Sequence, residues 1–196
     1  MPALEIILDG VTTVTVSTGE LTMLTVNVDG TVIDEALASL NVSGGNYSES
    51  GSSTYLTWVA RTPLQANQQV RVVFRQHGQS SQPGKTIAEL YPDASSAAQT
   101  DFTPTAKMFE EIRATPKVRE GFALHCRLSS GASFVGETMS GEFGFSLLIF
   151  WDARHPERAR VSLHSYSLGS LDARGPRRHL LKENMTFGDY VELRVA

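Results

Sequence analysis

The sequence predicts an all-β protein: two related antiparallel, sandwich-like halves that pack together, with one short helix in the connection between them. Three observations predict this fold. Apolar and polar residues alternate over many short segments, clusters of turn residues separate these segments, and the second half of the chain repeats the order and spacing of the first. Because a chain as short as either half buries a small share of its surface, we expect the halves to pack against each other.

The first half shows the alternation most clearly. Residues 11–18 alternate Val with Thr or Ser, which is the period of a half-buried strand. We interpret Asp29-Gly30 as a turn, and residues 43–53, rich in Gly, Ser and Asn, as a long loop. These boundaries predict strands over residues 4–9, 11–18, 21–28, 36–42, 54–60 and 70–75.

The second half can be laid over the first, segment by segment. The apolar stretch 145–151 matches residues 21–28, and each is followed by a charged turn. The strands expected in this half are 122–128, 133–139, 145–151, 161–168, 179–181 and 190–195. We therefore divide the chain into a first β repeat (1–78), a linker with a short helix (79–117) and a second β repeat (118–196).

Pro104 opens the one helix that the sequence predicts. Proline is favoured at the first helical position, and Met108, Phe109 and Ile112 would then share one face. Pro116 ends the segment. We expect this amphipathic helix to close one end of a sandwich or to bridge the halves.

The N-terminal segment, the cysteine count and the distribution of charge indicate the location of the protein and the kind of partner that it binds. The N-terminal segment lacks the basic and apolar regions of a secretory signal, and Cys126 is the single cysteine, which excludes an intrachain disulfide and a Cys-based metal site. We expect a cytoplasmic protein that does not bind a membrane. Residues 1–100 hold nine acidic and four basic side chains, which argues against nucleic acid and suits a partner with a basic surface, or serves solubility alone.

The residues that could carry chemistry form no catalytic pattern. No nucleophile motif occurs, and Cys126 alternates with apolar residues on one strand face, which predicts a buried thiol. The five histidines are isolated in the sequence, and we expect them at the surface. We interpret the basic cluster 174–180 as a solvated hairpin loop. The alternative is that it binds a phosphate, an RNA backbone or an acidic partner. We expect no catalytic residue, no cofactor and no metal.

Short patterns near the end of each half carry a resemblance to known proteins. They are Tyr55-Leu56-Thr57-Trp58, Pro63-Leu64 and Gln68-Gln69-Val70-Arg71-Val72 in the first half, and Phe187-Gly188-Asp189-Tyr190-Val191-Glu192-Leu193 in the second. The order of a Trp-bearing strand, a turn and a Val-rich final strand resembles small uncharacterised bacterial β-sandwich proteins of the toxin-immunity or accessory type. The resemblance implies a protein that binds a partner, and it carries over no functional residue.

We therefore expect a non-enzymatic protein-binding module, such as an immunity protein that neutralises a bacterial toxin by direct binding. Acidic loops would steer a basic partner onto the surface, next to exposed tyrosines. The alternative is a carbohydrate-binding or structural β-sandwich protein that uses aromatic residues, including Trp58, as a stacking surface. The sequence leaves open whether the protein forms a homodimer. The expected partner-binding residues are Asp29, Asp34, Glu35, Glu49, Tyr47 and Tyr55.

Overall fold

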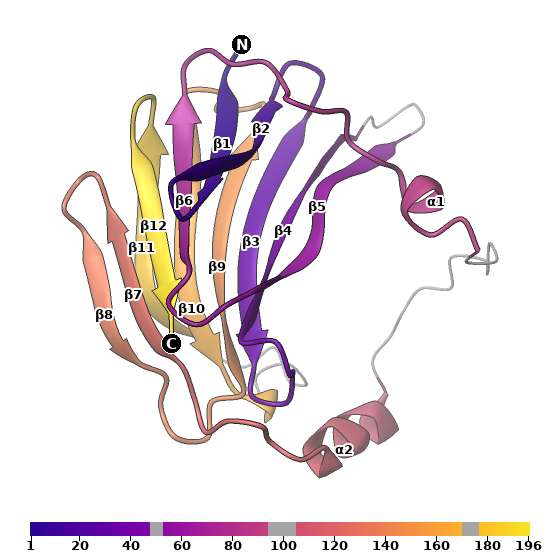
Figure 1. The fold of residues 1–196 in the computed structure, drawn as a ribbon, viewed down its shortest axis with the longest axis vertical. Helices are drawn as coiled ribbons and strands as arrows, with labels where there is room; N and C mark the ends of the chain where they lie inside the picture. The colour runs from indigo at the N-terminus through magenta and orange to yellow at the C-terminus, as the bar shows by residue number, and fades with distance from the viewer. Residues whose placement is uncertain (48–52, 94–104, 170–176) are drawn as a thin grey trace.

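The computed structural model describes residues 1–47, 53–93, 105–169 and 177–196. These residues form two six-stranded antiparallel sheets that face each other (Figure 1), which confirms the predicted all-β, sandwich-like fold. Sheet A has the strand order β2-β1-β6-β12-β7-β8, and sheet B has the order β11-β10-β9-β3-β4-β5. The strands are β1 (Ala3–Leu8), β2 (Val11–Ser17), β3 (Met23–Thr31), β4 (Ala38–Asn46), β5 (Thr54–Leu64), β6 (Gln69–Arg75), β7 (Ala123–Leu128), β8 (Ser133–Glu137), β9 (Gly144–Asp152), β10 (Arg158–Tyr166), β11 (Arg178–Thr186) and β12 (Tyr190–Val195).

Each half of the chain contributes three strands to each sheet. Strands six apart in order take equivalent places, so that β1, β2 and β6 of sheet A correspond to β7, β8 and β12 of the same sheet. The halves join where β6 pairs with β12 and β3 pairs with β9, both antiparallel. An approximate two-fold axis therefore runs between these central pairs, and a single hydrophobic core is shared by both halves.

Backbone hydrogen bonds between the halves repeat at an interval of 121 residues. Asn67 N donates to Val195 O, and the equivalent bond runs from Gly188 N to Phe74 O, each at 2.8 Å; the shifts are 67 to 188 and 74 to 195. The same interval relates the bonds Thr22 N to Gly45 O (2.9 Å) and Phe143 N to Tyr166 O (2.6 Å). Because bonds as well as strand order repeat, the two halves are related in backbone structure and not only in apolar pattern.

Alternating residues of each strand supply the core. In β9 the inward residues Phe145, Leu147, Ile149 and Trp151 are all buried. Cys126 of β7 also faces this core with no exposed surface, and burial raises the pKa of its thiol to about 12. The prediction of a buried cysteine is confirmed.

Two predicted turns lie inside strands instead. β3 continues through Asp29-Gly30, because Gly30 leaves room for the rings of Phe122 and Phe145, which meet edge to face at 4.9 Å between centroids. β4 likewise continues through Gly44-Gly45, where a side chain at either glycine would strike the backbone of a neighbouring strand. These glycines serve close packing, so the turn that joins β3 to β4 falls at residues 32–37.

Two helices, not one, lie in the described part of the connection between the halves. α2 (Ala106–Ala114), with Thr105 as N-cap, is the predicted helix, and it lies beside the lower end of the sandwich in Figure 1. Its Phe109 is buried, and Ile112 packs against the core. The short α1 (Ile87–Leu90) begins with a Thr86/Glu89 capping box, a sequence signal that predicts a helix start.

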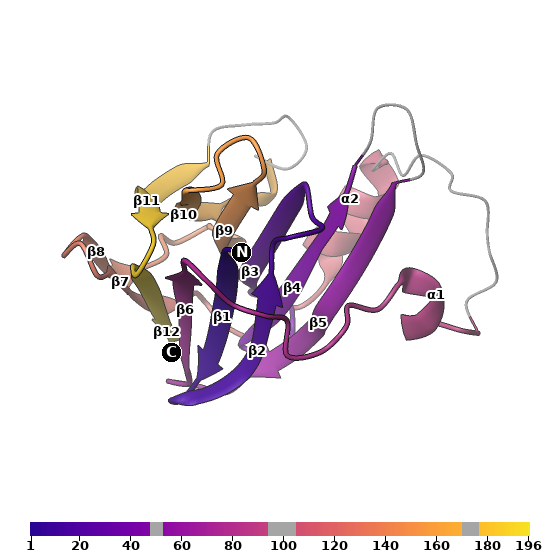
Figure 2. The same ribbon diagram turned by 90° about the horizontal axis from the view of Figure 1, so that it is seen from above.

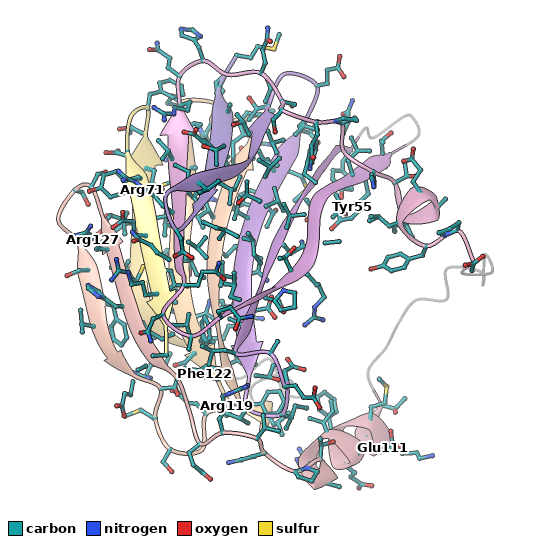
Figure 3. The ribbon with its side chains drawn as sticks, in the orientation of Figure 1. Tyr55, Arg71, Glu111, Arg119, Phe122 and Arg127 are labelled. Carbon is teal, nitrogen blue, oxygen red and sulfur yellow. The ribbon has the colours of Figure 1, made fainter. Side chains whose placement is uncertain are left out.

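Arg119, in the segment after α2, ties the connection to the first half. Its guanidinium donates to four carbonyl oxygens of the β3–β4 turn, those of Thr31, Asp34, Glu35 and Ala36, at 2.6–3.2 Å. Figure 3 shows Arg119 and Phe122 together at this lower end of the molecule.

Candidate partner-binding edge

A strap, which we define as residues 78–85, covers the outer edge of the first half. It leaves β6 and crosses the open side between β2 and β5 (Figure 2). Ser81 N donates to Thr15 O (2.9 Å), Thr15 N donates to the Ser81 hydroxyl (3.1 Å), and Ser17 N donates to the Ser80 hydroxyl (3.0 Å). The strap therefore satisfies three outward backbone groups of the edge strand β2, the N–H and C=O of Thr15 and the N–H of Ser17.

The strap then reaches the edge of the other sheet. Gln82 donates through its amide to Trp58 O (3.1 Å), and Lys85 exchanges two backbone hydrogen bonds with Thr57 of β5, each at 2.8 Å. One extended segment thus closes the outer edges of both sheets in the first half.

The equivalent edge of the second half has no such cover among the described residues. Ladder bonds alternate along the β7–β8 pair, beginning with Leu128 N to Ala132 O (2.8 Å), so the backbone N–H and C=O groups of Ser133, Val135 and Glu137 point away from β7. The Val135 side chain is 71% exposed, and β8 pairs with no strand on this side. A free strand edge of this kind is a site for pairing with another chain.

A hollow of about 360 Å³ extends from β8 across β7 to β12. It is lined by Val135 and Glu137 of β8, by His125 of β7, and by Arg194 of β12, among others. Pairing by β-strand addition gains affinity from main-chain hydrogen bonds and specificity from such side-chain hollows. Nearby, Arg127 makes an ion pair with Glu192 and adds positive charge to the outer face of sheet A (Figure 3).

Arg178 joins the edges of the two sheets in the second half, where the first half has the strap. Arg178 of β11 makes two hydrogen bonds to Glu142, at 2.8 and 2.9 Å, and donates to Glu137 O of β8 at 3.4 Å. The bonds from Arg178, together with those from the Ser165 hydroxyl and Met139 N, lower the pKa of Glu142 to about 2. The hydrogen bond from Arg178 to Glu137 O links the two sheets but leaves the N–H groups of Val135 and Glu137 without a described partner.

A second polar cluster lies on the outer face of sheet B. Ser146 donates to Asn27 (2.7 Å), Asn27 donates to Asp29 (2.7 Å), and Arg61 lies 3.8 Å from the Asp29 carboxylate. Burial raises the pKa of Asp29, against the lowering effect of Arg61. Tyr166 belongs to the same neighbourhood, and its pKa is raised to about 12, chiefly by burial.

His164 corrects the expectation that all five histidines lie at the surface. It is 6% exposed, its Nε2 lies 3.4 Å from Arg177 NH1, and its Nδ1 has no partner among the described residues. Burial, then the charges of Arg177 and His179, lower its pKa to about 4. An outward strand position predicts exposure from sequence, but the side chains packed around this face exclude water.

We expect His164 to make stability depend on pH. The pKa of His164 is near 6.5 in the unfolded chain and about 4 in the folded protein. Between these pH values the unfolded chain binds a proton at His164 and the native state does not, so the free energy of unfolding falls as the pH drops through this window. Urea unfolding should show that the free energy of unfolding of the native chain falls between pH 7 and pH 4.5. In His164→Gln this fall should be smaller by about 2 kcal/mol. The exposed His125→Gln is the control, and an equal loss in all three chains contradicts the assignment.

The structure separates the predicted partner-binding residues. Asp29, Asp34 and Glu35 lie at the lower end of β3 and β4, whereas Tyr47 and Tyr55 lie at the upper end of the β4–β5 pair, roughly 25 Å away along β4. Tyr55 is labelled at this upper end in Figure 3.

The acidic members of the set are not free loop residues. Asp29 lies within β3 and is bonded to Asn27, and Asp34 accepts from Thr31 (2.8 Å); of these, Glu35 alone is exposed. Glu49 lies outside the described residues, as do positions 174–176 of the basic cluster.

Trp58, and neither Tyr47 nor Tyr55, borders a hollow of about 850 Å³ that lies under the strap. Trp58, Leu56, Thr54, Asn46 and Glu20 line it. The indole Nε1 of Trp58 is buried and has no described partner, and Gly84 of the strap lies against the indole ring. Of the two tryptophans, Trp151 is a core residue and Trp58 is half-buried.

Comparison with known proteins finds no match: no protein-family model, curated protein or solved structure matches this chain. Within the described ranges, no helix is long and apolar enough to cross a membrane. The same residues contain no group of three or more His, Cys, Asp or Glu side chains placed to hold a metal ion.

Proposed function

We propose that this protein is a non-enzymatic protein-binding module that engages its partner along the β8 edge. The observation that supports the proposal is the difference between the halves: the chain's own strap covers the edge at β2, whereas the equivalent edge at β8 presents outward backbone groups and an exposed Val135. Edge strands with unpaired N–H and C=O groups are templates for added strands.

An immunity protein that neutralises a bacterial toxin fits this proposal. Such a protein would hold the toxin by strand addition and so block its active surface. The resemblance of the segments around Trp58 and Tyr190 to toxin-immunity proteins favours this role. Steering by acidic loops contributes less than the sequence suggests, because Asp29 lies within β3 and the charge of Arg61, 3.8 Å away, offsets its charge.

Sugar binding is the second candidate, and the hollow under the strap favours it. Trp58 lines that hollow. An oligosaccharide bound there would shift the indole N–H resonance of Trp58, which Trp58→Phe identifies by its loss. A panel of oligosaccharides that leaves this resonance unmoved argues against the candidate.

We expect Val135→Pro to weaken partner binding at least tenfold without unfolding the protein. The N–H at position 135 points away from β7, so proline removes an edge donor and leaves the β7–β8 ladder intact. The partner is first captured from a lysate of the source cell and identified by mass spectrometry, and its affinity for the purified native chain and the variant is then measured by calorimetry.

The matched control is Val135→Ala, which shortens the side chain and keeps the backbone donor. Loss of binding in Val135→Pro, with binding largely kept in Val135→Ala, supports pairing at the edge. A partner that binds Val135→Pro as tightly as the native chain overturns the proposed surface. Rescue of growth in cells that produce the captured partner tests the immunity role separately.

A further inference from the structure

We infer that the segment bound at the β8 edge is an extended peptide with adjacent hydroxyl side chains, which runs antiparallel to β8 as the strap runs along β2. The inference rests on the proposed function and deepens it, because it names the chemistry of the partner. The first half supplies the template, since its strap already occupies the equivalent edge.

The groups that the strap uses have free equivalents in the second half. The strap bonds the N–H groups of Thr15 and Ser17 and the C=O group of Thr15. Strand pairing shows which residues are equivalent: Thr15 of β2 lies opposite Glu5, as Val135 of β8 lies opposite His125. In the same register Ser17 of β2 corresponds to Glu137 of β8. The N–H groups of Val135 and Glu137 and the C=O of Val135 have no described partner, whereas Arg178 already bonds Glu137 O.

Two serine side chains of the strap make its contacts with the N–H groups of β2. The hydroxyls of Ser80 and Ser81, not main-chain carbonyls, accept the hydrogen bonds from β2. In the strap these hydroxyl oxygens take the place that main-chain carbonyls hold in a regular antiparallel ladder. A partner segment that follows the same path at β8 would need Ser or Thr at the two matching positions.

The internal repeat gives a way to build this complex within one chain. The strap begins shortly after Arg75 at the end of β6, and the 121-residue interval places Ala196 at the same point of the second half (75 to 196). A copy of residues 76–86 joined after Ala196 would therefore begin where a second strap must begin. Its local concentration at the β8 edge would be high, because binding becomes intramolecular.

The test is amide hydrogen exchange in the full chain with and without this added copy. We expect exchange at Val135 and Glu137 to slow at least tenfold in the extended chain. In a matched version whose added copy carries alanine in place of its two serines, the slowing should largely disappear. Exchange at Thr15 and Ser17, under the native strap, serves as the internal reference.

The outcomes separate this inference from the proposed function. Unchanged exchange at Val135 in the extended chain overturns the inference, and equal slowing by the serine and alanine copies overturns the hydroxyl requirement. The captured partner is tested in parallel. If Val135→Pro abolishes partner binding while the added copy gives no protection, the edge is the binding surface and the segment has another chemistry.

Discussion

The two halves, prepared separately as residues 1–93 and 105–196, are expected to assemble into the native sandwich when mixed, and neither is expected to fold stably alone. Each half alone would expose the long edges of two central strands, β3 and β6 in the first half and β9 and β12 in the second. The shared core would also be open along the same line. Small domains with a halved core and unpaired central edges fall below the threshold of stability.

The pairing also explains why each half should prefer the other to a copy of itself. On the approximate two-fold axis, Arg71 of β6 lies opposite Glu192 of β12, 3.6 Å apart between NH1 and Oε1. The interval of 121 residues makes these two positions equivalents (71 to 192), so a homodimer of first halves would place Arg71 opposite a second Arg71. Like charges directly opposite destabilise a strand pair and oppose the wrong assembly.

Circular dichroism and sedimentation of each half and of their equimolar mixture test this expectation. The mixture should gain sheet signal and form a one-to-one complex, and Arg71→Glu in the first half should weaken that complex by facing Glu192 with a like charge. Glu111→Gln on the exposed face of α2 is a control for loss of charge elsewhere. A first half that melts cooperatively as a monomer would contradict the model of two interdependent halves.

The strand pattern could be predicted because it is local, whereas two turns were wrong because packing decided them. A period of two marks a strand within a few residues, and every predicted strand of the second half found its equivalent in the first. Asp29-Gly30 has the composition of a hairpin turn, but the rings of Phe122 and Phe145 fill the space beside Gly30. The turn preference of an Asp-Gly pair takes no account of Phe122 and Phe145, which are about a hundred residues away in the sequence.

The binding edge was missed for a similar reason. Residues 133–139 were predicted as a strand, but whether a strand lies at an edge depends on the order of strands in the sheet. Ser80 and Ser81 of the strap lie in a polar segment whose composition predicts a loop. Their hydrogen bonds to β2 join residues that are far apart in the sequence. The Ser-Ser pair and the repeat of the β2 pattern at β8 are the sequence signals that point to this edge once the fold is known.

Gly30→Ala should lower the free energy of unfolding by about 3 kcal/mol or more. A Cβ at this position would lie 2.5 Å from the carbonyl oxygen of Leu37, 2.9 Å from Phe145 Cε1 and 3.0 Å from Phe122 Cε1. The first of these atoms belongs to the backbone and cannot rotate away. Alanine is normally tolerated better than glycine in a strand, so the sign of the effect tests the packing directly.

Gly169→Ala is the matched control, because the nearest atom to its added Cβ is the Ser167 hydroxyl at 3.9 Å, and it should change stability by less than about 0.5 kcal/mol. Urea unfolding of both variants measures the difference. A second variant separates the two sources of strain: combined with Phe122→Leu, Gly30→Ala should cost less than the sum of the single changes, because the ring contact is relieved while the Leu37 contact stays. Strict additivity would assign the whole effect to the backbone contact, and no loss in Gly30→Ala would overturn the packing of Phe122 and Phe145 against β3.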